Sequence, residues 1–322
     1  MYQQITPPHN KNVEYDYAIA FVRFVATFMV LNSHMGICYA KFPSLATGGA
    51  IGNALFFFIS GFTLFLGKPT SFPLYYKRRI SRIYPTVIAM AIVASLVWGL
   101  SQSFIGQMVH YWFVNCIMIY YAVLWVVRKY KINLWVVGIF SVLLTIAVYL
   151  SFHNFKSSLI YSNVVNRYIL YLVFMIQGAW MGIHRNNLKC RWFHPFILVI
   201  SVSGWYCLNY FLSSSPFQLI GIILLLGICW SLYLCFKAKF WHNWLQNSLF
   251  KTIIIFCGGL CLEVYLIQFY IFTDALNFIF PLNIPLIMCA VLLAAYLLRI
   301  FGRLIAQTFD SNPYNYPALF KI

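Results

Sequence analysis

The sequence predicts an all-α fold, a polytopic integral membrane bundle of about ten transmembrane helices. Of its 322 residues, 62% are hydrophobic and only 8% are charged, and long apolar runs follow one another along most of the chain. A soluble domain cannot keep that much apolar surface from water, so the chain belongs in a bilayer. No run alternates apolar and polar residues as the strands of a membrane barrel do, so we expect helices.

Each expected helix is a window of about 20 apolar residues, the length that crosses a hydrocarbon core of roughly 30 Å. Charged residues or clusters of Pro, Gly and Ser separate the windows. They lie near residues 16–37, 50–67, 83–101, 108–127, 133–152, 167–184, 194–213, 217–236, 252–272 and 284–305.

The positive charge alternates between the loops. Lys and Arg gather after the second, fourth, sixth and eighth windows and at the C-terminal end, whereas the intervening loops carry only Lys41 and Lys156. The positive-inside rule therefore places both termini in the cytoplasm, in agreement with an even number of helices. We expect one membrane domain over residues 1–322, made of a polar cytoplasmic N-terminus (1–15), the bundle (16–305) and a cytoplasmic tail (306–322).

The composition also excludes several classes of function. The nine cysteines are scattered without a CxxC pair, and there is no HExxH motif or carboxylate cluster, so neither a disulfide framework nor a protein-bound metal is expected. Most of the basic residues behind the net charge of +17 lie in loops, as is normal for a protein whose partners are membrane lipids, and no nucleic-acid-binding fold accompanies them.

The first window carries two ionisable residues, Arg23 and His34. They are eleven residues apart, which is about 16 Å along a helix and within about 20° of the same face. A charge at this depth usually faces a bundle interior, a partner or water. The alternative is that Arg23 extends toward the cytoplasm and His34 lies near the outer headgroups.

Two further segments have a purely structural explanation when each is considered alone. The second window contains Phe57, Phe58, Ser60, Gly61 and Phe62, which is typical of aromatic packing. The third window is preceded by a basic cluster that would orient the protein in the membrane. That cluster comprises Lys77, Arg78, Arg79 and Arg82 and is followed by Pro85.

In this order, the three segments resemble the acyltransferase 3 family of integral membrane acyltransferases. The family pattern is an Arg, ten residues and a His in the first helix, an FFxxSGF-like second helix, and an RRxxRxxP-like entry to the third. A His-x-Trp-Phe stretch at the fourth helix is matched by His110, Trp112 and Phe113. The motifs span roughly residues 15 to 115, and the remainder matches in helix count and hydropathy.

The resemblance implies an enzyme that transfers an acyl group, often acetyl, from cytoplasmic acyl-CoA to a hydroxyl of a cell-surface polysaccharide or lipid-linked glycan in a bacterial inner membrane. Acyl-CoA would be a donor substrate, with no bound cofactor. His34 is the candidate base or acyl carrier, because histidine titrates near neutrality. The arginines at 78, 79 and 82 are candidates for binding the donor's phosphates, with Ser60 beside them.

Two late-window residues complete the candidate site. Glu263, one of only two acids between Asp16 and Asp310, could orient His34 or neutralise Arg23, or it could be a structural carboxyl. Members of the family often carry a histidine after a Tyr-Leu pair in a late helix, and this chain has Gln268 there.

Two other classes of function remain open at this stage. A secondary transporter would also place ionisable groups in its helices, although no repeated halves with matching Gly or Pro breaks are found. A flippase or polymerase of lipid-linked glycans would suit the helix count, although the outer loops are short and nearly uncharged. A glycan-handling transporter is the second reading.

Overall fold

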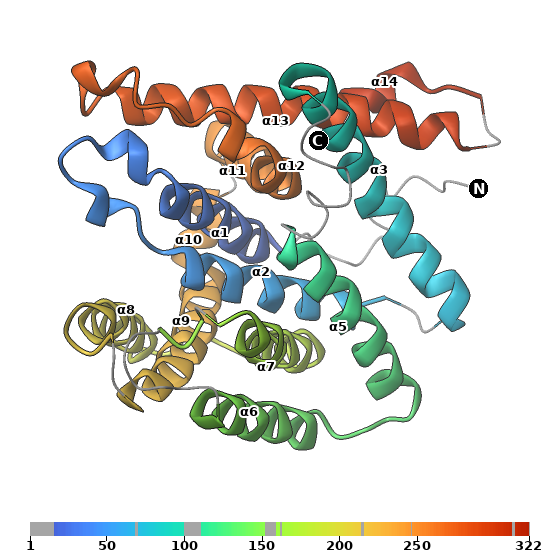
Figure 1. Ribbon diagram of the computed structural model, residues 1–322. Helices are drawn as coiled ribbons and strands as arrows, with labels where there is room; N and C mark the ends of the chain where they lie inside the picture. The colour runs from blue at the N-terminus through green and yellow to red at the C-terminus, as the bar shows by residue number, and fades with distance from the viewer. Residues whose placement is uncertain are drawn as a thin grey trace.

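The computed structural model describes a helical bundle whose long helices stack in layers (Figure 1). Among the described residues all regular structure is helical, which confirms the all-α class. The described residues are 16–67, 70–99, 111–151, 159–161, 163–213, 216–245, 247–310 and 313–321.

The long helices coincide with the predicted windows. Short 3₁₀ turns, α10 (Lys239–Leu245) and α14 (Tyr316–Leu319) connect or follow them. The main helices are α1 (Tyr17–His34), α2 (Gly49–Leu64), α3 (Phe72–Trp98), α5 (Trp112–Lys129), α6 (Leu134–Ser151), α7 (Val164–Ile183), α8 (His194–Phe211), α9 (Ile220–Lys237), α11 (Ser248–Gly259), α12 (Cys261–Ile267) and α13 (Asn283–Thr308).

Eight helices of the described chain are long and apolar enough to cross a membrane, or up to nine if a bent pair counts as one span. The chain is therefore a multi-pass membrane protein. Helix α8 lies in the seventh predicted window but is not among those eight. The count of ten and the cytoplasmic position of both termini stay predictions.

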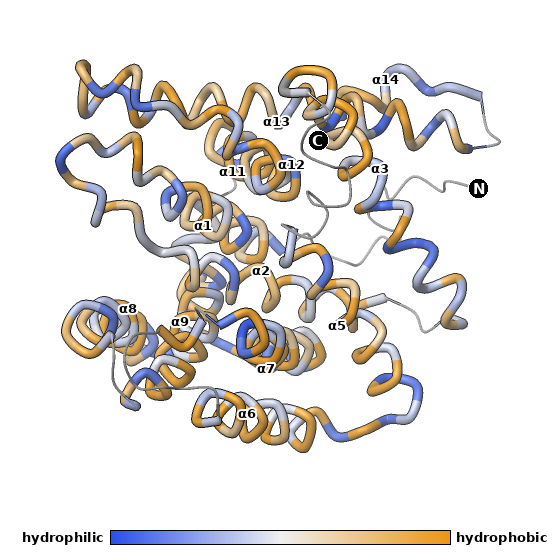
Figure 2. The backbone as a smooth tube through the Cα atoms, viewed as in Figure 1, coloured by the Kyte–Doolittle hydropathy of each residue, from blue (hydrophilic) through white to orange (hydrophobic). Residues whose placement is uncertain are grey.

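The expected start of the third helix was wrong. The window began at residue 83, whereas α3 begins at Phe72 and continues unbroken past Pro85 to Trp98. Hydropathy marks where a helix enters lipid, and Lys and Arg are good helix formers, so the basic cluster forms the first turns of α3 rather than a loop. Figure 2 shows a hydrophilic stretch near the start of α3 and apolar turns farther along it.

The ninth window was also wrong in being one continuous helix. It is broken at Leu260 into α11 and α12, which are bent by 51° relative to each other. The pair Gly258 and Gly259 immediately precedes the break, as is common at helix kinks. A break at membrane depth frees backbone carbonyls, which then need partners inside the protein.

Helix α2 lies in the middle of the bundle against α7. An added Cβ at Gly61 would lie 1.8 Å from the Met175 carbonyl oxygen, and one at Gly178 would lie 1.9 Å from that of Phe58. Only glycine permits the two backbones to approach so closely. Phe57, Phe58 and Phe62 are almost completely buried, so the aromatic part of the second motif does pack the core.

The buried apolar residues form two main clusters. One is built mainly on α2, α5, α7 and α9, and the other on the C-terminal end of α1 with α3, α12 and α13. Phe56, Ile83 and Phe113 pack against both clusters and so mark the seam between them.

Helix α2 presents a single accessible stripe toward its surroundings. Eleven of its residues are buried, and the other five recur at intervals of four and three. This spacing places them on one helix face. The stripe consists of Gly49, Asn53, Phe56, Ser60 and Thr63.

Candidate active site

His34 is the last residue of α1 and is half-buried. Its Nδ1 lies 2.9 Å from the Val30 carbonyl oxygen, one helical turn earlier. Because a carbonyl oxygen can only accept, this hydrogen bond requires the proton on Nδ1. The neutral ring then keeps its lone pair on Nε2, where it can accept a proton or attack an acyl group.

Gln268 lies directly against the same imidazole. Its Nε2 is 3.3 Å from His34 Nδ1, and its Oε1 is buried without a hydrogen-bond partner among the described residues. Two N–H donors cannot pair, and rotating the amide by half a turn would place Oε1 against the Nδ1 proton. That orientation gives both groups a partner. The Phe269 ring meets the imidazole edge-on at 4.7 Å between centroids.

Arg23 lies on α1 two helical turns or more before His34, and the interior position predicted for the stripe that the two residues share stays a prediction. Helix α1 is continuous through both residues. Arg23 is half-buried and lies within electrostatic reach of Arg82 on α3 and of Cys261 on α12. Arginines from two separate helices therefore converge at the level where α12 begins.

The arginine side chains of the basic cluster on α3 differ in their exposure. Arg78 and Arg82 are exposed, and Arg79 is half-buried. The Arg79 guanidinium lies over the Tyr75 ring at 5.4 Å and the Tyr121 ring at 5.1 Å, while its Nε is buried without a partner among the described residues. Tyr75, Arg79 and Arg82 follow at intervals of four and three, so one face of α3 leads from its basic end toward Arg23.

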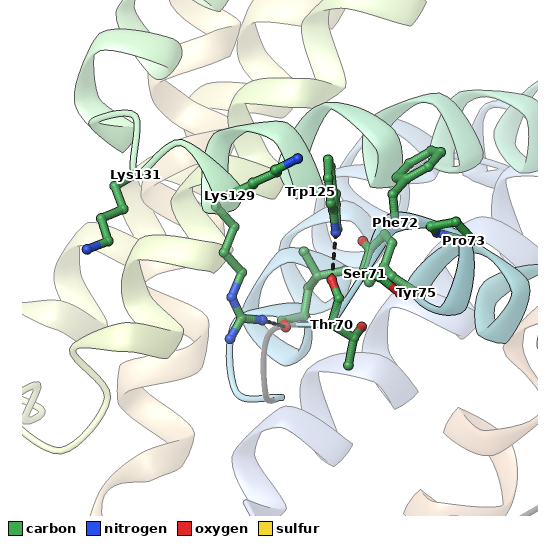
Figure 3. A pocket seen from close by; sticks show the side chains of 10 residues that line it. Thr70, Ser71, Phe72, Pro73, Tyr75, Trp125, Lys129 and Lys131 are labelled. Atoms are coloured by element: carbon green, nitrogen blue, oxygen red, sulfur yellow. Dashed lines mark hydrogen bonds between the residues drawn. The ribbon is translucent and has the colours of Figure 1, made fainter.

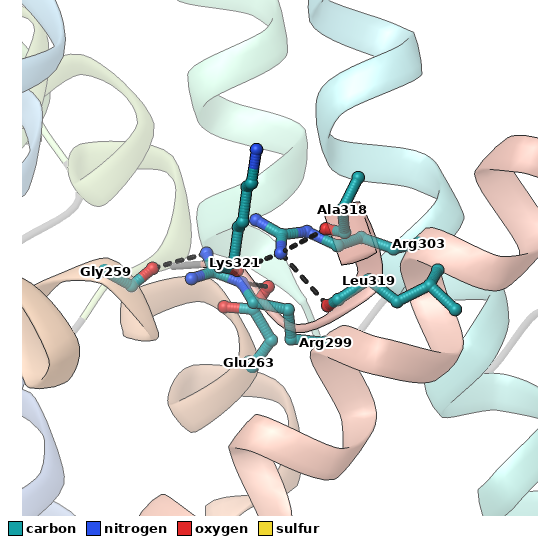
Figure 4. A network of polar contacts seen from close by, with 7 residues as sticks. All are labelled: Gly259, Glu263, Arg299, Arg303, Ala318, Leu319 and Lys321. Carbon is teal, nitrogen blue, oxygen red and sulfur yellow. Dashed lines mark hydrogen bonds and ion pairs between the residues drawn. The ribbon is translucent and has the colours of Figure 1, made fainter. Parts of the chain in front are cut away.

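Glu263 pairs with neither of the partners that its position in the sequence suggested. Its Oε1 accepts from Arg299 Nε on α13 at 3.1 Å, and Arg299 Nη2 also donates to the Gly259 carbonyl at 2.5 Å. Figure 4 shows this ion pair beside Arg303, whose Nη1 donates to the carbonyls of Ala318, Leu319 and Lys321. Arg299 thus satisfies both a carbonyl freed by the break and a carboxylate that is 3% exposed.

The assignment of Glu263 to His34 or Arg23 is therefore corrected to a pair with Arg299. Its Oε2 is buried and has no partner among the described residues. Cys261 lies within electrostatic reach of Glu263, Arg299, Arg82 and Arg23 together. Three arginines and one carboxylate thus lie near Cys261, so positive charge exceeds negative charge around the start of α12.

The remaining predicted residues occupy the periphery of this arrangement. Ser60 is half-buried on the accessible stripe of α2. Trp112 and Phe113 begin α5, and Phe113 packs in the seam, whereas His110 lies outside the described residues. No group of three potential metal ligands occurs in the described part of the chain.

Sequence reasoning missed Arg299, which was counted among the C-terminal loop charges. A signal was present, because Arg299 lies inside the window 284–305, as Arg23 lies inside the first window. Gln268 was noted as a departure from the family pattern, but its contact with His34 joins residues 234 positions apart and is invisible to local patterns.

Comparison with known proteins identifies the family. A family model described as an acyltransferase domain, that of the acyltransferase 3 family, matches residues 16–300. No curated protein and no solved structure matches the chain. Since the family match extends over most of the 322 residues, the chain belongs to the acyltransferase 3 family and is a membrane acyltransferase.

Proposed function

We propose that this acyltransferase moves an acetyl group from cytoplasmic acyl-CoA to a hydroxyl of a cell-surface polysaccharide or lipid-linked glycan, in a bacterial inner membrane. The observation that carries the proposal is the His34 ring, whose Nδ1 is bonded to the Val30 carbonyl, so that Nε2 holds the lone pair. Hydroxyl acylation needs a proton acceptor of this kind.

In this reaction His34 Nε2 takes the proton from the acceptor hydroxyl while the hydroxyl oxygen attacks the thioester carbonyl. The carbon–sulfur bond then breaks, and the departing thiolate takes the proton from the imidazolium. The products are an ester and free coenzyme A, and the histidine returns to its starting state. The Val30 carbonyl and the Gln268 amide stabilise the imidazolium, because both lie beside its Nδ1–H.

The arginines of α1 and α3 are the proposed binding groups for the phosphates of the acyl donor. Coenzyme A bears a pyrophosphate and a 3′-phosphate, which arginine binds in a fork. Arg79 keeps an unpartnered Nε, and Arg82 is exposed within reach of Arg23. This line of cations would guide the pantetheine arm along the seam, from the predicted cytoplasmic side toward His34.

The test is transfer of labelled acetyl from acetyl-CoA into the glycan fraction of membrane vesicles that contain the full chain. His34→Ala is expected to lower transfer by about 10²- to 10⁴-fold, the usual contribution of a general base. The matched control is His184→Ala, because His184 directly follows α7 and its Nδ1 likewise lies 2.9 Å from the carbonyl four residues earlier. Transfer retained in the His34 variant would refute the assignment.

A second measurement separates a base from an acyl carrier. The purified protein is incubated with labelled acetyl-CoA without any glycan. A base leaves the protein unlabelled, whereas an acyl carrier yields label bound to the chain that disappears in the His34 variant. Absence of transfer by the folded wild-type protein, with its matched acceptor present, would instead favour a role in moving the glycan across the membrane.

A further inference from the structure

A pocket of about 590 Å³ opens between the end of α2, the start of α3 and the end of α5 (Figure 3). Its volume falls in the range of small-molecule sites. It lies apart from His34, at the basic end of α3. Its lining combines aromatic rings, hydroxyl groups and cations: Leu64, Thr70, Ser71, Phe72, Pro73, Tyr75, Trp125, Arg128, Lys129 and Lys131.

Among the described residues, no acidic side chain forms an ion pair with the three cations of this pocket. The sequence contains no Asp or Glu between Asp16 and Glu263, so none occurs on α2, α3, α5 or their connections. Lys129 and Lys131 are exposed, and the Lys129 ammonium lies 4.8 Å from the centre of the Trp125 ring. The pocket is therefore a concave surface with uncompensated positive charge, which favours a ligand with several negative charges.

Arg128 is held in place by the protein itself. Its Nη1 donates to the Leu64 carbonyl at 3.2 Å, and its Nη2 donates to the Gly67 carbonyl. These bonds fix the guanidinium at the end of α2 without neutralising its charge. A fixed cation binds an anion with little loss of side-chain freedom.

The start of α3 adds to the positive character of the pocket. Ser71 precedes this 27-residue helix, its side chain makes no capping hydrogen bond, and the first turn contains no acid. The first backbone N–H groups of a helix lack partners within it and attract anions. Ser71, Phe72 and Pro73 all line the pocket, so this helix end faces the same space as the cations.

Aromatic rings form another part of the lining. Phe72 meets Trp125 edge-on at 5.0 Å, and Trp125 Nε1 donates to the Thr70 carbonyl at 3.0 Å, which fixes the indole (Figure 3). Tyr75 connects the pocket to the candidate active site, because the Arg79 guanidinium lies over its ring. A ligand here would have a flat ring beside aromatic groups, phosphates beside cations, and a chain directed toward Arg79.

We propose that this pocket binds the nucleotide end of the acyl donor, with Arg128, Lys129 and Lys131 binding its phosphates. The inference rests on the proposed function, and it moves the phosphate contacts partly from the α3 arginines to the end of α5. A phospholipid headgroup offers the same phosphate chemistry without the purine ring, so the experiment must distinguish the two sources.

The first arm compares two donors with the double variant Lys129→Gln/Lys131→Gln. Acetyl-CoA carries the nucleotide, and acetyl-pantetheine lacks it. The variant is expected to raise KM for acetyl-CoA by about tenfold, equivalent to about 1.4 kcal/mol of binding, with kcat unchanged. Transfer from acetyl-pantetheine should not change. Equal losses with both donors, or no change in either KM, would overturn the proposal.

The control is Lys189→Gln, which removes one exposed basic-loop charge between α7 and α8, away from the pocket. It should leave KM for acetyl-CoA unchanged. If it raised KM as much as the pocket variant does, the effect would be one of general positive charge. The measurement is made in bilayers with and without anionic lipid, and an effect confined to anionic bilayers would assign the pocket to phospholipid.

The second arm needs no enzymatic activity. Labelled adenosine 3′,5′-bisphosphate, the nucleotide fragment alone, is bound to the purified full chain. Saturable binding that weakens in the double variant and persists in Lys189→Gln supports the pocket even if the wild type shows no transfer to the chosen glycan. No saturable binding by the folded wild type overturns it. The binding assay therefore tests the pocket, and the transfer assay tests the proposed reaction, so that either hypothesis can fail without the other.

Discussion

Substituting Gly61 by alanine tests whether the close approach of α2 and α7 holds the bundle together. The added Cβ would lie 1.8 Å from the Met175 carbonyl oxygen, whereas ordinary contact begins at 3.4 Å. The helices would have to separate locally by the difference, 1.6 Å. Because the obstacle is backbone, no rotamer change relieves it, and we expect a loss of about 3 kcal/mol or more in unfolding free energy.

The assay is thermal unfolding in detergent, with Gly138→Ala as the matched control. Gly138 lies within α6, and its added Cβ would meet Ile176 Cγ2 at 3.6 Å, an ordinary contact. Alanine is a better helix former than glycine by about 1 kcal/mol, so the control should be neutral or slightly stabilising. The Gly61 variant should melt roughly 5 °C or more below wild type. Equal melting temperatures for the two variants would refute the packing argument.

Two further outcomes follow from the polar contacts. Arg299→Leu should destabilise the protein by about 3 kcal/mol or more in the same unfolding assay, because it leaves Glu263 charged and buried, and adding Glu263→Gln should recover part of that loss. If the double variant is no more stable than Arg299→Leu, the ion pair is not the cause. Gln268→Leu should lower kcat for acetyl transfer about tenfold while KM and melting temperature hold, since it removes only a partner of His34 Nδ1. Gln268→Glu keeps a hydrogen-bond acceptor at that position, so this variant should transfer acetyl at a rate near that of wild type. An equal loss of kcat in both variants would show that Gln268 does not act by positioning His34.

The sequence predicts most of the helical plan because a membrane imposes one strong rule on it. Every span must be apolar for about 20 residues, and this length can be read without knowledge of contacts. The rule fails where helix and membrane boundaries differ, as at Phe72, where α3 begins eleven residues before its apolar window. It fails again at Leu260, because the hydropathy of a broken helix equals that of a straight one.

The candidate site is predicted less completely, for a different physical reason. Arg23 and His34 share one helix, so their common face follows from helical geometry alone. The partners of Glu263 and His34 come from other helices, and only the packing of those helices determines which side chains meet. Arg299 reaches Glu263 across 36 residues, and a helix break that periodicity does not reveal brings the two together.

The arginines near the start of α12 bear on the proposed route by which an anionic donor would reach His34. Among the described residues Glu263 pairs with Arg299, and no carboxylate forms an ion pair with Arg23 or Arg82. A cation in lipid costs several kcal/mol unless it meets water or an anion. Arg82 is exposed although its neighbour Ile83 packs against both apolar clusters. Under the proposed function, an anionic donor would supply the missing negative charge, so the arginines that are costly inside a membrane would favour a ligand that carries phosphate.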